Sequence, residues 1–265
     1  MSGEPGAALD AVAALYDRLS PTFLRCAGPT FQAGLVRRPD GVEDAAWSNR
    51  ALAERAGVQP GAHILDAGCG VGGPACDIAA AFPDAQVVGL TVSVVQVDLA
   101  TERARAAGLS ERVTFVEGDF HALPFADDTF DVVLYLESSE YSSDLDRLFA
   151  EAARVLKPGG AVYVKGALRR EGALSPQQQA DLAAYDAMWA IQRTPSPSEI
   201  AAAMARTGLV VGLPTWLELG SGHFIGSMFE LGPDGLKPNA FGQALFRRFV
   251  DLPVGFADIR AVCPP

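Results

Sequence analysis

A glycine-rich turn between an apolar strand and a helix is the feature that most constrains this chain. Residues 63–74 read HILDAGCGVGGP, and Gly68, Gly70 and Gly73 satisfy the spacing G-x-G-x-x-G. Glycines at this spacing let the backbone approach a bound nucleotide closely at the start of a helix. Asp66 stands two residues before the first of these glycines. The turn therefore predicts a nucleotide-type cofactor site at the end of a strand.

Short apolar strands and helical segments alternate around this turn. Strands are predicted at residues 62–66, 86–90, 112–117, 130–136 and 161–166, and helices at residues 74–81, 93–107 and 145–156. Such alternation is typical of a mostly parallel sheet with helices on both faces. Ligands of these sheets bind beyond the carboxyl ends of the strands, so we expect the functional residues in the loops that follow the strands.

The segments on either side of this core are less regular. Helices are predicted at residues 9–20, 42–57, 176–191, 198–207 and 241–250, and strands at residues 209–219 and 254–262. We expect three parts. Residues 1–57 form an N-terminal helical cap, residues 58–166 form the cofactor-binding α/β core, and residues 167–265 add acceptor-binding cap helices and the last strands of the sheet.

Charge and hydropathy argue against several classes of function. The chain has 265 residues, of which 32 are acidic and 21 basic, for a net charge of −11. Such a negative surface repels phosphate backbones, which argues against general nucleic-acid binding. The N-terminus lacks the pattern of a signal peptide, and no apolar run reaches the ~18–20 residues of a membrane span. We therefore expect a cytoplasmic protein with no membrane insertion.

Cysteine and histidine spacing argues against a disulfide framework and a metal site. No C-x-x-C pair occurs among Cys26, Cys69, Cys76 and Cys263, so free thiols are expected. No metal-ligand spacing occurs among His63, His121 and His223.

The stretch LDAGCGVGG resembles the first motif of class I S-adenosylmethionine (SAM) methyltransferases. Further motifs follow in that family's order at residues 88–96 (VGLTVSVVQ), 117–120 (EGDF), 123–131 and 154–160. The second of these is similar to the branch that contains sterol, tocopherol and other small-molecule methyltransferases. The resemblance covers about residues 60–166. It implies a Rossmann-like class I methyltransferase fold, with a mostly parallel seven-stranded sheet, helices on both faces and a helical cap.

A nucleotide-dependent oxidoreductase is an alternative interpretation of the glycine turn. Hydride-transferring enzymes usually carry an acidic residue for the ribose at the end of the second strand. Here that position holds Thr91, and no Tyr-x-x-x-Lys pair occurs in the chain. Both observations disfavour this alternative.

The resemblance implies that SAM is the cofactor and that each motif binds a different part of it. The glycine turn and Asp66 would hold the methionine part, the residues after the second strand the ribose, and Asp119 with Phe120 the adenine. An aromatic residue of the N-terminal helix would touch the sulfonium region. The expected cofactor residues are Tyr16, Asp66, Gly68, Gly70, Leu90, Thr91, Gln96, Asp119, Phe120 and Leu136.

The segment LYLESSEY at residues 134–141 carries the expected chemistry. Much of the branch reads Glu-Ser-x-x-His here, and Tyr141 replaces that His. The Glu-Ser-x-x-Tyr version and residues 252–261 resemble the geranyl diphosphate C-methyltransferases, whereas residues 30–34 lack that group's His-rich segment. Glu137 either removes a proton after alkene methylation or braces the cofactor loop. The expected catalytic residues are Glu137, Tyr141 and His223.

The expected acceptor is a small molecule held by the cap. Its candidate contacts are Phe31, Arg169, Tyr185, Trp189, Trp216 and Phe224. A diphosphate head group would need cations, for which the candidates are Arg25, Arg37, Arg38, Arg169, Arg170 and His223. Mg²⁺ would accompany only such a diphosphate.

We expect SAM-dependent C-methylation of an isoprenoid or prenyl compound in specialised metabolism. The alternative is O- or N-methylation of a polyketide, glycoside or phenolic natural product, with Glu137 or His223 deprotonating a hydroxyl. A SAM-binding protein without catalysis is a further alternative. The segment after residue 209 could pair subunits in a homo-oligomer.

Overall fold

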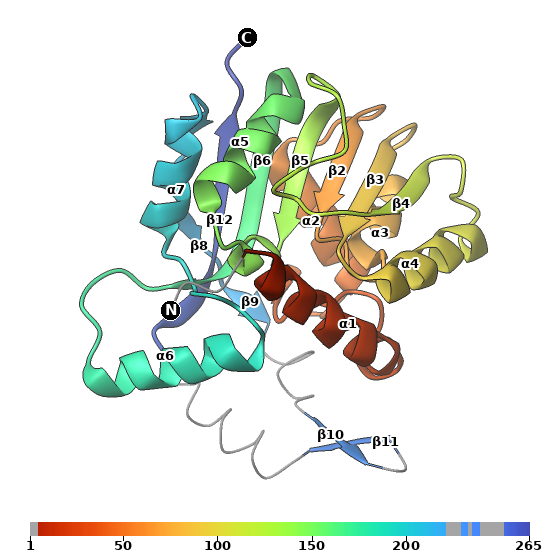
Figure 1. Cartoon of the computed structure of the whole chain (residues 1–265). Helices are drawn as coiled ribbons and strands as arrows, with labels where there is room; N and C mark the ends of the chain where they lie inside the picture. Colours follow the sequence, from red (N-terminus) through yellow and green to blue (C-terminus); the bar gives the residue numbers. More distant parts are fainter. Residues whose placement is uncertain (1–4, 221–228, 233–234, 239–251) are drawn as a thin grey trace.

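The computed structural model describes residues 5–220, 229–232, 235–238 and 252–265, and its centre is one mixed β-sheet (Figure 1). The strands lie in the order β4-β3-β2-β5-β6-β12-β7, and a short strand β8 also pairs with β12. The parallel strands are β2 (His63–Ala67), β3 (Gln86–Thr91), β4 (Val113–Glu117), β5 (Phe130–Leu136) and β6 (Leu156–Arg169). Three strands complete the other edge, where β12 (Val254–Val262) is antiparallel to β6, β7 (Val210–Val211) and β8 (Thr215–Trp216). The expected Rossmann-like, mostly parallel sheet is confirmed, with β8 as a short addition to the seven strands.

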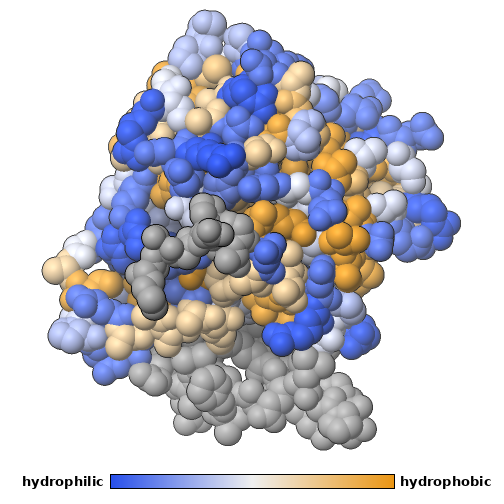
Figure 2. Space-filling view, in the orientation of Figure 1, coloured by the Kyte–Doolittle hydropathy of each residue, from blue (hydrophilic) through white to orange (hydrophobic). Residues whose placement is uncertain are grey.

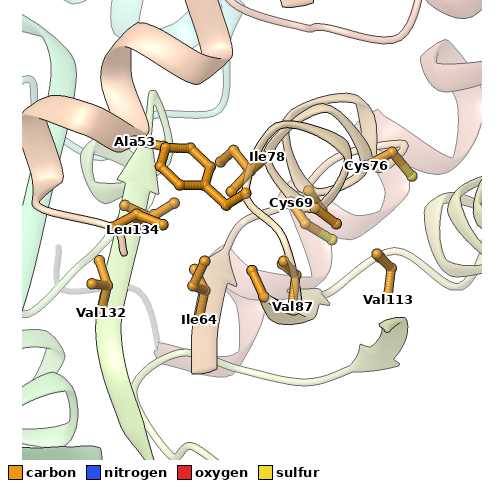
Figure 3. Packing of buried hydrophobic residues seen from close by; sticks show 14 of the residues in the cluster. Ala53, Ile64, Cys69, Cys76, Ile78, Val87, Val113, Val132 and Leu134 are labelled. Atoms are coloured by element: carbon orange, nitrogen blue, oxygen red, sulfur yellow. The ribbon is translucent and has the colours of Figure 1, made fainter. Parts of the chain in front are cut away.

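Helices cover both faces of this sheet, because the side chains of each strand point alternately to two apolar cores. One face packs against α2 (Ala45–Ala56), α3 (Gly73–Ala81) and α4 (Val94–Ala106). Ile64, Val87 and Leu134 point into this core (Figure 3). The other face packs against α5 (Leu145–Val155) and α7 (Pro197–Arg206), with Leu65 and Val133 in the second core. Within the expected cap of residues 1–57, α2 therefore packs on the core of the sheet.

Two further helices, α1 (Pro5–Ala27) and α6 (Pro176–Met188), lie at the carboxyl end of the parallel strands (Figure 1). The predicted end of the first helix at residue 20 is wrong, since α1 continues through Pro21. A proline inside a helix removes one backbone donor and clashes with the preceding turn. Ser20 and Thr22 on either side are buried, so tertiary packing retains the helix.

The segment after α7 is broken into short strands. The prediction of one strand at residues 209–219 is wrong, because β7 and β8 flank Pro214, which has no N–H for a sheet ladder. A third piece, β9 (Leu219–Gly220), pairs with β1 (Leu35–Val36), and β10 (Phe229–Gly232) pairs with β11 (Gly235–Pro238). The helix predicted at residues 241–250 lies outside the described residues.

The strand predicted at residues 161–166 is the middle of a much longer strand. The pairing between β5 and β6 shifts from Phe130 opposite Leu156 to Val132 opposite Ala161, which accommodates the Lys-Pro-Gly-Gly turn as an irregularity. Beyond it, β6 carries Lys165 next to Leu136 at the carboxyl end of β5. A 3-10 turn, η1 (Ser139–Tyr141), follows β5. Among the helices that the structure describes, none has the length and apolar character of a membrane span.

Candidate cofactor and acceptor site

A cavity lies at the carboxyl ends of β2, β3 and β5. Apolar surface gathers beside α1 at this end of the sheet in the central part of Figure 2. The lining residues come from α1, from the loops after the strands and from residues 31–32. They are Leu9, Val12, Tyr16, Phe31, Gln32, Gly68, Cys69, Gly70, Pro74, Leu90, Thr91, Val92, Gln96, Gly118, Phe120, Leu136, Glu137, Ser138 and Tyr141.

The glycine turn after β2 is packed too closely for side chains. Gly68 has a φ of +89°, and a Cβ atom there would lie 2.3 Å from the Cβ of Ser138. A Cβ at Gly73 would lie 2.3 Å from the carbonyl oxygen of Pro29. The Ser138 hydroxyl in turn donates to the carbonyl of Ala67 over 2.5 Å. The turn therefore needs glycine to bring the ends of β2 and β5 together at the cavity.

Asp66 ends β2 beneath this turn and is buried with one unsatisfied oxygen. Its Oδ2 has no hydrogen-bond partner. Burial without a counter-charge raises the pKa of Asp66 to about 7. An unpaired buried carboxylate is costly unless a donor reaches it. The position therefore fits a cationic amino group, such as the one SAM carries.

The turn after β3 is tied to α1 by side-chain hydrogen bonds. Thr91 donates to Gln96 Oε1 over 2.6 Å, and Gln96 Nε2 donates to Ser20 Oγ over 3.0 Å. The Ser93 hydroxyl donates to the Asp17 carboxylate over 2.5 Å. The residues expected at the ribose are thus the same residues that hold α1 over the cavity.

Asp119, after β4, is oriented by His121. One carboxylate oxygen of Asp119 accepts from the backbone N–H of His121 at 2.9 Å and lies 2.7 Å from its Nδ1. Partial burial raises the pKa of Asp119, but the hydrogen bonds from His121 outweigh it and the pKa lies below its usual range. His121 Nε2 lies 2.8 Å from the hydroxyl of Ser142, just after η1. His121 thus links the expected adenine side to the loop that follows β5.

Glu137, directly after β5, lines the cavity in a left-handed backbone conformation with a φ of +60°. Its Oε2 accepts from the backbone N–H of Ala33 over 2.8 Å, and its Oε1 pairs with the ammonium group of Lys165. Lys165 is fully buried and also donates to the Gly34 carbonyl and to Gln32 Oε1. Both oxygens of Glu137 are therefore engaged, which restricts a role as a free base.

A second buried carboxyl group, Glu140, lies in η1. Its Oε1 accepts from the backbone N–H of Ala167 over 2.6 Å. A Cβ at Gly166 would come within 2.7 Å of the same oxygen, so a side chain there would displace the carboxyl group. Burial, reinforced by the charge of Glu137, raises the pKa of Glu140 to about 7. Glu140 therefore holds a proton for part of the time near neutral pH.

Aromatic side chains from α1, η1 and α6 gather at the cavity. The hydroxyls of Tyr16 and Tyr141 lie 2.6 Å apart, and burial raises the pKa of Tyr16 to about 12. The ring of Phe23 lies 5.7 Å from that of Phe31 and 6.4 Å from that of Trp189, measured between centroids. Of these rings, those of Tyr16, Tyr141 and Phe31 line the cavity and give it an apolar and electron-rich wall.

Known methyltransferases match the core of this chain. A family model described as a methyltransferase domain matches residues 65–164. The sterol 24-C-methyltransferase erg6 of Aspergillus fumigatus is 46% identical over 113 residues, which are 43% of this chain and 30% of that enzyme. The core of this chain is a class I SAM-dependent methyltransferase domain. The chain spans less than a third of that relative's length.

Two solved structures resemble nearly the whole of this chain. The structure of the [4+2]-cyclase SpnF superposes with a TM-score of 0.78 at 26% identity, over 99% of both chains. The geranyl diphosphate C-methyltransferase of Streptomyces coelicolor A3(2) superposes with a TM-score of 0.76 at 19% identity, over 98% of this chain and 99% of the other. The second likeness shows a shared fold alone.

The expected cofactor residues of the methyltransferase domain lie around the cavity. Asp66 is buried behind the glycine turn, and Asp119 lies between the lining residues Gly118 and Phe120. The other eight contribute directly to the lining, namely Tyr16, Gly68, Gly70, Leu90, Thr91, Gln96, Phe120 and Leu136. Their individual roles remain proposals.

The expected acceptor residues are divided by the structure. Phe31 lines the cavity and Trp189 contacts Phe23 beside it, while Tyr185 is close enough to Tyr16 and Tyr141 to interact with them. Trp216 lies on the edge strand β8, is 40% exposed and stacks on the guanidinium of Arg170. Arg169 also lies elsewhere, where it pairs with Glu199 of α7. His223 and Phe224 are outside the described residues.

Sequence reasoning missed the polar residues that brace the site. Lys165 contacts Glu137, His121 contacts Asp119, and Gln32 contacts Lys165, but none of the three belongs to a quoted motif. One signal was available for Lys165, because it is a lone charge in the otherwise uncharged run AVYVKGAL. A charged residue in the middle of a buried strand must find a partner.

Proposed function

We propose that this protein binds SAM in the cavity and transfers its methyl group to a carbon atom of an uncharged isoprenoid-type acceptor. The observation that carries this proposal is the make-up of the cavity wall. One part of the wall is the glycine turn, which lies over the unpaired carboxyl group of Asp66. Another part consists of aromatic and apolar side chains. The 46% identity between this core and a sterol 24-C-methyltransferase supports the same assignment.

The residues of the turn and of the strand ends would bind and orient the cofactor. Asp66 would accept from the amino group of SAM, Thr91 and Gln96 would hold the ribose, and Asp119 with Phe120 would hold the adenine. SAM, when bound, supplies a methyl group on a sulfonium that is already a strong electrophile. The protein therefore acts mainly by alignment and by exclusion of water.

The acceptor side of the wall suits a reaction that creates positive charge. Attack of an alkene carbon on the methyl group forms a carbon–carbon bond and leaves a carbocation, which regains a double bond when a neighbouring carbon loses a proton. The faces of Tyr16, Tyr141 and Phe31 favour such a cation. Glu137 is the carboxylate of the wall that could accept the proton, and its assignment as a base stays a prediction.

The charges around the cavity favour an acceptor without a diphosphate group. Among the described lining residues there is no Arg or Lys. Arg38 is paired with Asp40 and Asp44, and Arg169 with Glu199. Converging cations are the usual partners of phosphate groups, so an uncharged acceptor fits this wall better. Mg²⁺ would be required only if the acceptor were a diphosphate.

A binding and labelling experiment tests this proposal. S-adenosylhomocysteine (SAH) is titrated by calorimetry, and deuterated-methyl SAM is then supplied with an uncharged sterol-type alkene, with geranyl diphosphate plus Mg²⁺, or with a phenol. We expect SAH to bind and the label to appear on carbon of the uncharged alkene. Label on geranyl diphosphate would overturn the uncharged class. Label on oxygen or nitrogen would support the O- or N-methylation alternative.

Two tryptophan variants test where the acceptor lies. Trp189→Ala removes a ring of the aromatic group beside the cavity, and we expect it to raise the KM for the acceptor by about tenfold, the loss of roughly 1.4 kcal/mol of apolar contact. Trp216→Ala is the matched control, because that ring stacks on Arg170 at the sheet edge. Equal effects of the two variants would contradict this placement.

A cyclisation without methyl transfer is the second candidate function. It is favoured by the likeness to the [4+2]-cyclase SpnF over 99% of both chains, at 26% identity. The engaged state of Glu137 agrees with it, since a pericyclic ring closure needs no base. The two functions differ in stoichiometry. Methyl transfer converts one SAM to SAH for each product, whereas cyclisation of a polyene leaves SAM unconsumed.

A further inference from the structure

Lys165 is a fully buried amine whose donors all have acceptors from this chain. Its ammonium group contacts the Glu137 carboxylate, the Gly34 carbonyl at 2.8 Å and Gln32 Oε1 at 3.2 Å. It also lies 4.9 Å above the ring centroid of Phe256 on β12. A buried cation is stable only when it is paired and hydrogen-bonded to this extent. Its position is therefore fixed by contacts from three separate segments.

The ion pair between Lys165 and Glu137 is oriented with respect to the cavity. Glu137 contributes to the lining, whereas Lys165 lies behind it and has no exposed surface. The pair is consequently a dipole with its negative end toward the cavity. The N–H of Ala33 holds the second oxygen of Glu137, so this dipole cannot rotate freely.

The order of the strands places this dipole away from the adenine side. The motifs expected at adenine and ribose follow β4 and β3, and the glycine turn follows β2. Glu137 follows β5, on the other side of β2 from β3. A cofactor that extends from adenine at β4 to methionine at β2 would present its sulfonium toward the β5 end, where Tyr16 and Tyr141 also lie.

We propose that Lys165 is a positioning residue that fixes the Glu137 carboxylate as the negative wall of the cavity, so that positive charge at the transferred methyl group and on the acceptor is favoured. This inference rests on the proposed function. Fixed dipoles aimed at a developing charge are effective because they need no reorganisation during the reaction. Glu137 acts here through its charge, and the acceptors that suit the site are those that become cationic on methylation.

The test compares SAM with SAH, which differ at the sulfur in a methyl group and a positive charge. Dissociation constants of both are measured by calorimetry for the wild type and for Glu137→Gln, which keeps the side-chain size. We expect Glu137→Gln to weaken SAM relative to SAH by about tenfold, a modest value for the loss of one nearby opposite charge. Glu151→Gln, which removes a carboxylate paired with Arg154 outside the cavity, is the matched control.

A double-mutant cycle tests the role of Lys165. Lys165→Met removes the contact that holds the Glu137 carboxylate in place, so it should reduce the preference for SAM over SAH as Glu137→Gln does. In the Glu137→Gln background it removes an unpaired ammonium group that repels the sulfonium, so the preference should not fall further there. The double variant contains no unpaired charge and keeps the test valid if Lys165→Met alone fails to fold. If each substitution lowered the SAM preference by its own amount, so that it fell further in the double variant, the proposal would be overturned.

The possible failures are distinguishable. Wild-type protein that binds neither SAM nor SAH would contradict the proposed function itself. Wild-type protein that binds both, with the same ratio of dissociation constants in Glu137→Gln, would overturn the dipole and leave the proposed function standing.

Discussion

Asp66 is expected to couple cofactor binding to the release of a proton. Its buried carboxyl group has a pKa raised to about 7, so it is about half protonated near neutral pH before a ligand binds. A cationic amino group beside it would favour the ionised form. We expect SAH binding at pH 7 to release about half a proton from this group. Calorimetric titrations in buffers of different ionisation enthalpy measure that number. Release of the same number of protons by Asp66→Asn would contradict the assignment. Glu140→Gln measures any contribution from Glu140, the other carboxyl group with a raised pKa.

The same group makes stability depend on pH. The pKa of Asp66 is higher in the folded protein than in the unfolded chain, so the folded state binds its proton more tightly. The resulting destabilisation is fully present above about pH 7 and absent below the unfolded value of about 4. We expect Asp66→Asn to raise the Tm of the cofactor-free protein by about 3 °C or more at pH 8, and to leave it unchanged at pH 4. Thermal unfolding followed by circular dichroism provides the measurement.

His121 is expected to act on cofactor affinity through Asp119. Asp119→Ala removes the carboxylate expected at adenine, and we expect the Kd for SAH to rise by about tenfold or more, the loss of one charge-assisted hydrogen bond. His121→Phe keeps the ring and removes its contacts to Asp119 and Ser142, so a smaller rise is expected. His63→Phe is the control, because His63 contacts the carbonyl of Thr129 at the opposite end of the strands. A larger effect of His121→Phe than of Asp119→Ala would contradict this order.

Helix α1 is held over the cavity by three side-chain contacts, which join Tyr16 to Tyr141, Asp17 to Ser93 and Ser20 to Gln96. Asp17→Ala removes one of them together with the cap that Asp17 supplies to the N-terminus of α4. We expect faster hydrogen exchange across α1 in this variant, and partial recovery of protection when SAH is bound. Arg18→Ala changes an exposed neighbour on the same helix and should leave exchange unchanged. Equal exchange rates in the two variants would argue against this role of Asp17.

Elements whose signals are local were predictable from the sequence. The strands at residues 130–136 and 254–262 have the predicted ends, because apolar runs bounded by turn residues specify them. The course of α1 through Pro21 and the pairing of β1 with β9 depend on contacts that local patterns do not encode. The glycine turn and the lining residue Phe120 were likewise visible as motifs. The contact of Lys165 with Gln32 was not, since it joins residues 133 positions apart.

The β12 strand connects helix α2 to strand β6 through one carboxylate. Asp258 on β12 accepts from Arg55 of α2 over 2.5 Å and from the hydroxyl of Tyr163 on β6 over 2.7 Å. We expect Asp258→Asn to lower the free energy of unfolding by about 1–3 kcal/mol, the usual cost of a lost charge-assisted hydrogen bond. The Kd for SAH should be unchanged, because Asp258 is not part of the cavity wall. Urea denaturation measures the effect, and Glu54→Gln, in an exposed pair with Arg50, should have almost none. A changed Kd in Asp258→Asn would show that the sheet edge and the cavity are coupled.

The contacts of the Lys165 ammonium group join segments that leave the ribosome at different times. Gln32 leaves the ribosome 133 residues before Lys165. At the usual elongation rate of roughly 5–20 residues per second, that interval is about 7–27 s. During this interval, the oxygens of Gln32 and Gly34 that later accept from Lys165 are hydrogen-bonded to water. This part of the cavity wall therefore cannot form before β6 has been synthesised, and a translational pause placed before β6 would lengthen the time during which it stays open.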